Sequence, residues 1–156
     1  ILYVTGTLGD ALAGFELAEA GLEGPATLMN AYNRPSARLR EGQALVSVVT
    51  AMMDISDGLL LDADRIAAAS KVRIAIDLSA IPLSDAYRRQ RGDGLESRMQ
   101  AASWGDDYQL LFAAPSDVKL PVPATAIGQI SEGSGLTMSD AGTPIPLPAS
   151  LGYEHR

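Results

Sequence analysis

The sequence predicts an α+β domain in which helices cover a mixed sheet. Segments with continuous or alternating apolar residues are mixed with segments of helical spacing, but the regular β-α alternation of a doubly wound fold is missing. The chain of 156 residues, 47% of them apolar, is also long enough to bury one core. We therefore expect a single domain.

The first elements follow from apolar periodicity and from residues that end helices. Residues 1–5 are typical of a short buried strand, and residues 8–20 carry apolar side chains at helical spacing up to a glycine. A second helix is expected at 25–32, because proline is tolerated in the first turn of a helix. The proline in 33–35 disfavours helix at the residue before it. A serine can then cap a short helix over residues 36–41.

The middle of the chain is predicted to contain two strands and three helices. Residues 45–55 are strongly apolar, and the second half of this run is expected to form a strand. Apolar residues from 59 to 67 trace one face of a helix. Residues 72–78 alternate apolar and polar side chains, which is typical of a strand. Two short helices are expected at 84–90 and 95–102, on either side of a glycine-rich link.

The last third is predicted to contain strands and loops. Residues 109–114 and 124–130 are strand candidates. Beyond them, glycines and prolines interrupt short β-like pieces, so the chain is expected to end in loops.

Composition excludes several classes of function. The net charge is −7 and there are only two lysines, so no basic surface is expected that could neutralise a nucleic-acid backbone. No apolar run approaches the roughly 20 residues that span a bilayer. The absence of cysteine excludes disulfides and permits a reducing, cytoplasmic setting. The one histidine, His155, lies at the chain end, which argues against a Ser-His-Asp triad or a histidine-rich metal site.

The most informative segment lies where the apolar run ends and the next helix begins. Asp54, Ser56 and Asp57 place two carboxylates and a hydroxyl within four residues, followed by Gly58. Strand-to-helix junctions expose side chains at one edge of a sheet, where oxygen ligands can hold Mg²⁺ together with phosphate oxygens. The alternative is that Ser56 or Asp57 only caps the helix. One cap needs only one polar side chain, and the surplus favours a site.

A second acidic cluster precedes the strand at 109–114. Asp106 and Asp107 lie between Trp104 and Tyr108 in the sequence. Adjacent carboxylates repel and raise each other's pKa unless a cation or a donor relieves them, so a positive group could bind here. A solvated turn is the alternative, since glycine and aspartate are common turn formers.

The glycine turn at residues 5–10 stands before a predicted helix. Free N–H groups at a helix start can cradle an anion, but this turn matches neither the dinucleotide fingerprint nor the P-loop. A tight turn required for packing is the better interpretation.

Four segments together resemble thiamine-monophosphate kinase, in the same order along the chain. They are YVTGTLGD at 3–10, RP at 34–35, MDISDGL at 53–59 and GDDYQLLF at 105–112. The third segment is also similar to the wider superfamily of aminoimidazole-ribonucleotide synthetase, selenophosphate synthetase and a hydrogenase maturation factor. The fourth segment and the Gly-Tyr ending favour the thiamine enzyme. The resemblance covers nearly the whole chain and implies a three-layer α/β/α sandwich with a mixed sheet, like the carboxy-terminal domain of aminoimidazole-ribonucleotide synthetase.

The resemblance implies ATP-dependent phosphorylation of thiamine monophosphate to thiamine diphosphate, with several Mg²⁺ ions and in-line transfer between phosphates. It implies Asp54 and Asp57 as Mg²⁺ ligands and Ser56 as an ATP contact. Asp106 would bind the substrate at a position where the family usually has a glutamate. Tyr153 would be the aromatic contact to thiamine monophosphate near the chain end, although from the residues alone a packing anchor is the more common role.

The resemblance further implies that residues 1–156 form the single carboxy-terminal domain of a two-domain kinase. The amino-terminal domain, which would supply most metal ligands, much of the ATP site and the dimer interface, is then missing from this sequence. The full-length protein is expected to be a cytoplasmic homodimer, and this chain alone to have little or no kinase activity. Gln109 also stands where the family usually has a glutamate, so substrate contacts are expected to be shifted or weaker.

Two other functions remain open. Another ATP-dependent synthetase or maturation factor of the same superfamily would share the motif at 53–59. A noncatalytic ligand-binding α+β module would use the acidic turn only for capping. Mg²⁺-dependent binding of thiamine phosphates would distinguish the kinase from both.

Overall fold

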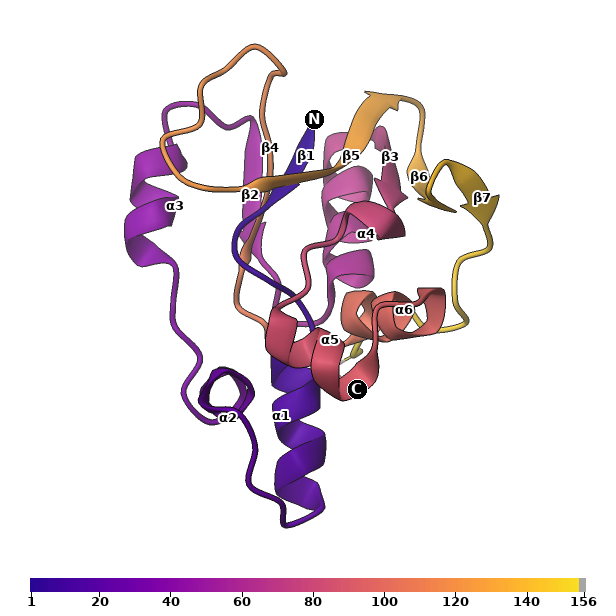
Figure 1. Ribbon diagram of the computed structural model, residues 1–156. Coiled ribbons are helices and arrows are strands. Elements are labelled where there is room, and N and C mark those ends of the chain that lie inside the picture. Colours follow the sequence, from indigo (N-terminus) through magenta and orange to yellow (C-terminus); the bar gives the residue numbers. More distant parts are fainter. Residues whose placement is uncertain (155–156) are drawn as a thin grey trace.

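The computed structural model describes residues 1–154, which form one mixed sheet with helices around it (Figure 1). The strands, in their order across the sheet, are β2 (Ala51–Asp54), β4 (Leu110–Ala113), β1 (Leu2–Val4), β5 (Thr125–Glu132), β3 (Val72–Asp77), β6 (Gly135–Asp140) and β7 (Thr143–Ile145). The pair β3 and β6 is parallel, and the other neighbours are antiparallel. The predicted α+β class with a mixed sheet is therefore confirmed.

The helices lie around this sheet in three groups. They are α1 (Asp10–Glu19), α2 (Ala26–Asn33), α3 (Leu39–Leu45), α4 (Leu59–Ser70), α5 (Asp85–Arg91), α6 (Leu95–Ser103) and the 3₁₀-helix η1 (Leu78–Ala80). In Figure 1, α4 runs along the sheet with α6 near it, α1 and α2 lie side by side beyond one end, and α3 lies beside β2. None of the helices within the described residues is long and apolar enough to cross a membrane.

The core is divided by the sheet into two apolar clusters. On the side of α4, strand β3 buries Ile74 and Ile76 and exposes the alternate residues, as its period of two predicts. On the other side, Leu45 of α3 and Phe112 of β4 are fully buried, and the Tyr3 ring stacks on Phe112 at 5.5 Å. The implied α/β/α layering is present: α4 covers one face of the sheet, and α3 is the helix that covers the other face.

The third helix differs from the sequence prediction. A cap at the serine of 36–41 was expected, whereas α3 begins at Leu39, Ser36 is exposed and the helix continues to Leu45. Burial of Leu45 against Phe112 requires the later end, and such tertiary packing outweighs a local capping preference. For the same reason Val48 and Val49, which follow α3, pack on this cluster, and the strand begins only at Ala51.

Candidate functional site

The two acidic motifs of the sequence meet where β2 ends and the loop before β4 passes beside it. The N–H of Asp106 donates to the Ser56 carbonyl at 2.9 Å, and the N–H of Tyr108 donates to the Ile55 carbonyl at 2.8 Å. A Cβ on Gly105 would lie 2.3 Å from the Ser56 carbonyl oxygen, so only glycine allows this close approach. The backbone thus joins the two motifs into one site.

The end of the chain forms another side of this site. The N–H of Tyr153 donates to the Asp57 carbonyl at 2.8 Å. Gly152 lies against the same group, since a Cβ there would be 2.2 Å from the Asp57 carbonyl oxygen. The Tyr153 side chain therefore lies beside the strand-to-helix junction, with 64% of the residue exposed.

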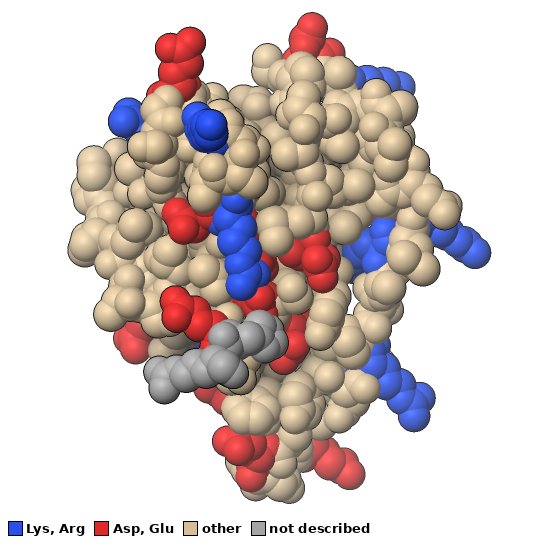
Figure 2. Space-filling model, turned by 180° about the vertical axis from the view of Figure 1, so that it is seen from behind, with Lys and Arg blue, Asp and Glu red and all other residues tan. Residues whose placement is uncertain are grey.

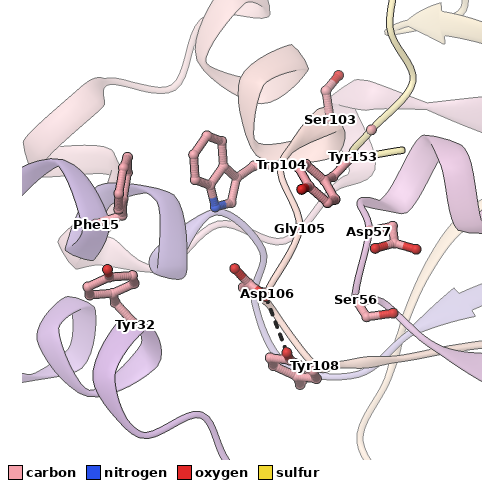
Figure 3. Close-up of a pocket in the computed structure, with 11 residues that line it drawn as sticks. Phe15, Tyr32, Ser56, Asp57, Ser103, Trp104, Gly105, Asp106, Tyr108 and Tyr153 are labelled. Carbon is pink, nitrogen blue, oxygen red and sulfur yellow. Dashed lines mark hydrogen bonds between the residues drawn. The ribbon is translucent and has the colours of Figure 1, made fainter. Parts of the chain in front are cut away.

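A pocket of about 610 Å³ opens between α1, α2, the junction, the acidic loop and the chain end (Figure 3). Its wall is largely aromatic. The Phe15 ring lies between those of Trp104 and Tyr32, with centroid distances of 5.3 and 5.6 Å. The residues that line the pocket are Phe15, Tyr32, Ser56, Asp57, Ser103, Trp104, Gly105, Asp106, Tyr108, Gly152 and Tyr153.

Four of the five predicted site residues line this pocket. They are Ser56, Asp57, Asp106 and Tyr153. The fifth, Asp54, is exposed at the end of β2 and is not part of the lining. It still acts on the pocket electrostatically: the charge of Asp106 raises the pKa of the Tyr108 phenol, and Asp54 adds a smaller effect in the same direction. Asp54 therefore belongs to the same acidic environment.

The Asp57 carboxylate forms an ion pair with Arg65. One Arg65 nitrogen, Nη1, lies 2.5 Å from Asp57 Oδ2 and 2.7 Å from Asp62 Oδ1. Asp62 is fully buried, and its Oδ2 accepts the N–H groups of Ser56 and Asp57, each at 3.1 Å. Burial raises the pKa of Asp62, although these N–H donors and Arg65 act in the opposite direction. Asp62 thus reaches back from α4 and shapes the turn that carries the motif.

The capping alternative for Ser56 and Asp57 is wrong. The N-cap of α4 is Gly58, with a φ of 120° that side chains rarely allow, and a Cβ there would lie 2.9 Å from a carbonyl oxygen at the end of α6. Sequence reasoning missed Asp62 and Arg65. Their one signal was an acidic residue in the first helical turn followed by arginine three positions later, which is common on any helix surface.

The adjacent carboxylates Asp106 and Asp107 have different surroundings. Asp106 lines the pocket and accepts the Tyr108 hydroxyl at 3.2 Å, drawn as the dashed line in Figure 3. Asp107 is buried, and both its oxygens lie 3.1 Å from the Gly9 nitrogen. Burial raises the pKa of Asp107 well above its ordinary value. Because the Gly9 N–H is occupied, the glycine turn serves packing, and the anion-cradle alternative loses support.

Gln109, where the family usually has glutamate, is buried and does not line the pocket. Its Oε1 accepts the Thr5 hydroxyl at 3.0 Å and the Arg38 Nε–H at 2.9 Å. A Cβ on Gly6 would lie 2.4 Å from the same oxygen. The contacts of Gln109 are thus with the turn after β1 and with Arg38, so a shift of substrate contacts stays a prediction.

The carboxylates suit Mg²⁺ in kind but do not form a complete metal site by themselves. Within residues 1–154, no group of three or more His, Cys, Asp or Glu could hold a metal ion. Asp54 and Asp57 offer two carboxylates, and Arg65 already binds one of them. His155 lies outside the described residues. Figure 2 shows acidic side chains gathered on one face of the molecule, with basic side chains among them.

The comparisons with known proteins agree with this fold. Residues 1–140 match the family described as AIR synthase related protein, C-terminal domain. The match covers most of the chain, so the chain belongs to this family.

Within this class, the chain is similar to thiamine-monophosphate kinases, as the motifs indicated. The Salmonella typhimurium kinase is 37% identical over 169 residues, covering 99% of this chain and 51% of the relative. The crystal structure of the Stenotrophomonas maltophilia K279a kinase has a TM-score of 0.78 at 33% identity, over 92% of this chain and 50% of that chain. The structure of AaThiL complexed with AMPPCP and TMP has a TM-score of 0.82 at 32% identity, over 98% of this chain and 50% of that chain. The chain therefore spans about half the length of these relatives.

Proposed function

We propose that this chain forms the thiamine-binding part of a thiamine-monophosphate kinase, which uses ATP and Mg²⁺ to convert thiamine monophosphate to thiamine diphosphate. Relatives with this name are similar over nearly the whole chain, and one related structure holds AMPPCP, an ATP analogue, together with TMP. The activity is proposed for the whole protein, because the chain spans half of its relatives.

The observation that carries this proposal is the aromatic pocket with carboxylates at its edge. Thiamine combines a flat pyrimidine with a positively charged thiazolium ring. Aromatic faces attract flat rings and positive charge, and a nearby carboxylate adds Coulomb attraction. Phe15, Tyr32 and Trp104 offer such faces, while Asp106 and Tyr153 line the same pocket. We propose Asp106 and Tyr153 as substrate contacts.

The strand-to-helix junction is the part of the pocket suited to phosphates. Ser56 lines the pocket next to Asp57, and we propose that its hydroxyl contacts ATP. Asp54 and Asp57 would hold Mg²⁺ with phosphate oxygens and with groups from the other half of the protein. When bound, the metal would screen the phosphate charges and align them. Arg65 would remain on Asp62 when a metal takes the Asp57 carboxylate.

The proposed transfer needs no general base from this chain. A phosphate oxygen of thiamine monophosphate attacks the γ-phosphorus of ATP, the bond from that phosphorus to the β-phosphate oxygen breaks, and ADP leaves. The acceptor oxygen is already ionised at neutral pH, because the second pKa of a phosphate monoester is about 6. The described residues line the pocket with hydroxyl groups, carboxylates and aromatic rings, which is compatible with this chemistry.

Other features of the whole enzyme are proposed with the activity. The amino-terminal half found in the relatives would complete the ATP and metal sites and pair two copies of the protein. The enzyme would then be a cytoplasmic homodimer.

Trp104 provides the direct test, because it is the only tryptophan and lies in the pocket wall. Titration of thiamine monophosphate into this chain is expected to change Trp104 fluorescence saturably. Uridine monophosphate, which has a phosphate but no positive ring, is the control ligand. Asp106→Asn and Tyr153→Ala are each expected to weaken binding by about fivefold to tenfold, the effect of losing roughly 1 kcal/mol of attraction.

Asp117→Asn is the matched control variant, since Asp117 is an exposed carboxylate in the loop after β4. It should leave the affinity unchanged. Equal binding of thiamine monophosphate and uridine monophosphate would refute the assignment of this pocket to thiamine. Equal affinities of Asp106→Asn and Asp117→Asn for thiamine monophosphate would refute it as well.

A further inference from the structure

Asp107 is a buried carboxylate that the proposed reaction does not use. It is 9% exposed and absent from the pocket lining, whereas its neighbours Asp106 and Tyr108 line the pocket. Both of its oxygens lie 3.1 Å from the backbone nitrogen of Gly9. This buried side chain is therefore fixed to a distant part of the chain.

The loop around Asp107 has a backbone that requires support. Asp106 and Tyr108 have φ values of 65° and 49°, in the left-handed region that residues with side chains rarely adopt. Such conformations persist where surrounding contacts determine them. The N–H groups of Asp106 and Tyr108 bind the end of β2, which holds the backbone of the loop. The Asp107 carboxylate holds the loop through a side chain.

The same carboxylate caps α1. Gly9 is the N-cap of α1 and has no side chain to accept a helix N–H. An oxygen acceptor at a helix start is favourable, because it satisfies an N–H group that has no partner within the helix. Asp107 therefore replaces the missing cap from another loop. Gly9 cannot carry one itself, because a Cβ there would lie 2.6 Å from the Tyr87 ring.

Asp107 thereby joins two walls of the pocket. One wall is its own loop, with Asp106 and Tyr108. The other is α1, which carries Phe15, and the Phe15 ring lies 5.3 Å from that of Trp104. A shift of α1 relative to the loop would separate these walls.

We propose that Asp107 is a positioning residue: by capping α1 from the acidic loop, it holds Asp106, Tyr108 and Phe15 in the arrangement that forms the pocket. The proposal concerns the geometry of the pocket, and only the identity of its ligand rests on the proposed function.

The test compares three substitutions of Asp107 with one control. Asp107→Asn keeps an oxygen acceptor for the Gly9 N–H. Asp107→Glu keeps the charge but displaces the oxygens by one methylene, and Asp107→Ala removes the contact. Leu45→Ala is the control, because Leu45 is fully buried in the cluster on the opposite face of the sheet. It should destabilise the fold without moving the pocket.

Two readouts are used on the 156-residue chain. The first is acrylamide quenching of Trp104 without ligand, and the second is the dissociation constant for thiamine monophosphate. Asp107→Ala and Asp107→Glu are expected to increase quenching and to weaken binding about tenfold, equivalent to 1.4 kcal/mol. Asp107→Asn and Leu45→Ala should resemble the wild type in both.

Quenching in Asp107→Ala no greater than in Leu45→Ala would overturn the proposal. If Asp107→Ala does not fold, Asp107→Glu and Asp107→Asn decide. A glutamate variant that resembles the wild type, together with a perturbed asparagine variant, would show that the charge of this side chain matters and the position of its oxygens does not. This result would contradict the positioning role. If the wild-type chain does not bind thiamine monophosphate, the proposed function fails for this chain, and quenching without ligand still tests Asp107.

Discussion

Arg65 is shared by two carboxylates at the start of α4. Asp62 is fully buried, and the Arg65 guanidinium is its counter-charge. We expect Arg65→Ala to lower the free energy of unfolding by about 1–3 kcal/mol, the usual cost of leaving a buried polar group without its partner. A value in the lower half of this range is expected, because 43% of the Arg65 side chain is exposed, and water can partly replace the guanidinium as a partner of Asp62. Urea denaturation at neutral pH measures this difference.

An exposed arginine on α5, Arg89, is the control for the loss of one surface charge. Arg89→Ala should change stability little. In the double variant Arg65→Ala with Asp62→Asn, the uncompensated charge is absent, so the loss should be smaller than the sum of the single effects. If the losses of stability in the two single variants add up to the loss in the double variant, Arg65 and Asp62 do not stabilise the fold through their interaction.

Single residues show how far the sequence could predict this site. Asp54, Ser56 and Asp57 stand out in the sequence because they are adjacent. Asp62 and Asp107 act by reaching backbone N–H groups that the fold brings to them, at Ser56 and at Gly9. Adjacent residues reveal a motif, whereas contacts between distant segments depend on the tertiary structure.

At the scale of elements, Asp77 connects the end of β3 to the turn between β6 and β7. Its Oδ1 accepts the N–H and hydroxyl of Ser79 at 3.0 and 2.8 Å, and the N–H of Ala141 at 3.0 Å. Burial alone would raise the pKa of Asp77, but these hydrogen bonds outweigh it and lower the pKa. We expect Asp77→Ala to cost about 1 kcal/mol at neutral pH, as for the loss of a typical hydrogen bond.

This contribution should depend on pH with a defined sign. Because the pKa of Asp77 is lower in the folded state, the unfolded chain binds the proton more readily, and stability falls as pH decreases. The contribution is complete above the unfolded pKa of about 3.9 and is lost as pH falls through the lower folded value. Urea denaturation of wild type and Asp77→Ala at pH 7 and below pH 4 measures this, with Asp117→Asn as control. An equally large difference at both pH values would contradict it.

Elements with a clear apolar period were predictable, and those fixed by tertiary packing were not. Strand β3 and helix α4 match the expected segments because one side of each faces the same core. Helix α3 was placed too early, since its position depends on Leu45 meeting Phe112 of a strand much later in the chain. The strand predicted at 109–114 is β4 (Leu110–Ala113), one residue shorter at each end, which is the usual uncertainty of element ends.

At the scale of the whole molecule, the order of strands could not be read from the sequence. Strand β1 lies between β4 and β5, which come more than a hundred residues later. The order of strand-like and helical segments indicated a mixed sheet, but many strand orders satisfy the same apolar pattern. Only the family resemblance selected the right architecture, and the likeness to solved kinase structures, with a TM-score of 0.82 for one of them, confirms it.

The proposed division of the active site between this chain and the other half of a longer protein leads to the last prediction. Asp54 and Asp57 are the two carboxylates proposed for a metal ion, and Arg65 binds one of them. Residues 1–154 contain no group of three or more His, Cys, Asp or Glu that could hold a metal ion. We therefore expect the chain alone to bind thiamine monophosphate but to form no ADP above a protein-free control, while the full-length protein does form ADP. Asp57→Asn in the full-length protein should reduce ADP formation much more than Asp117→Asn. Robust ADP formation by the 156-residue chain would mean that its two carboxylates and the substrate phosphates suffice to bind the metal, and the proposed dependence on an amino-terminal half would then be wrong.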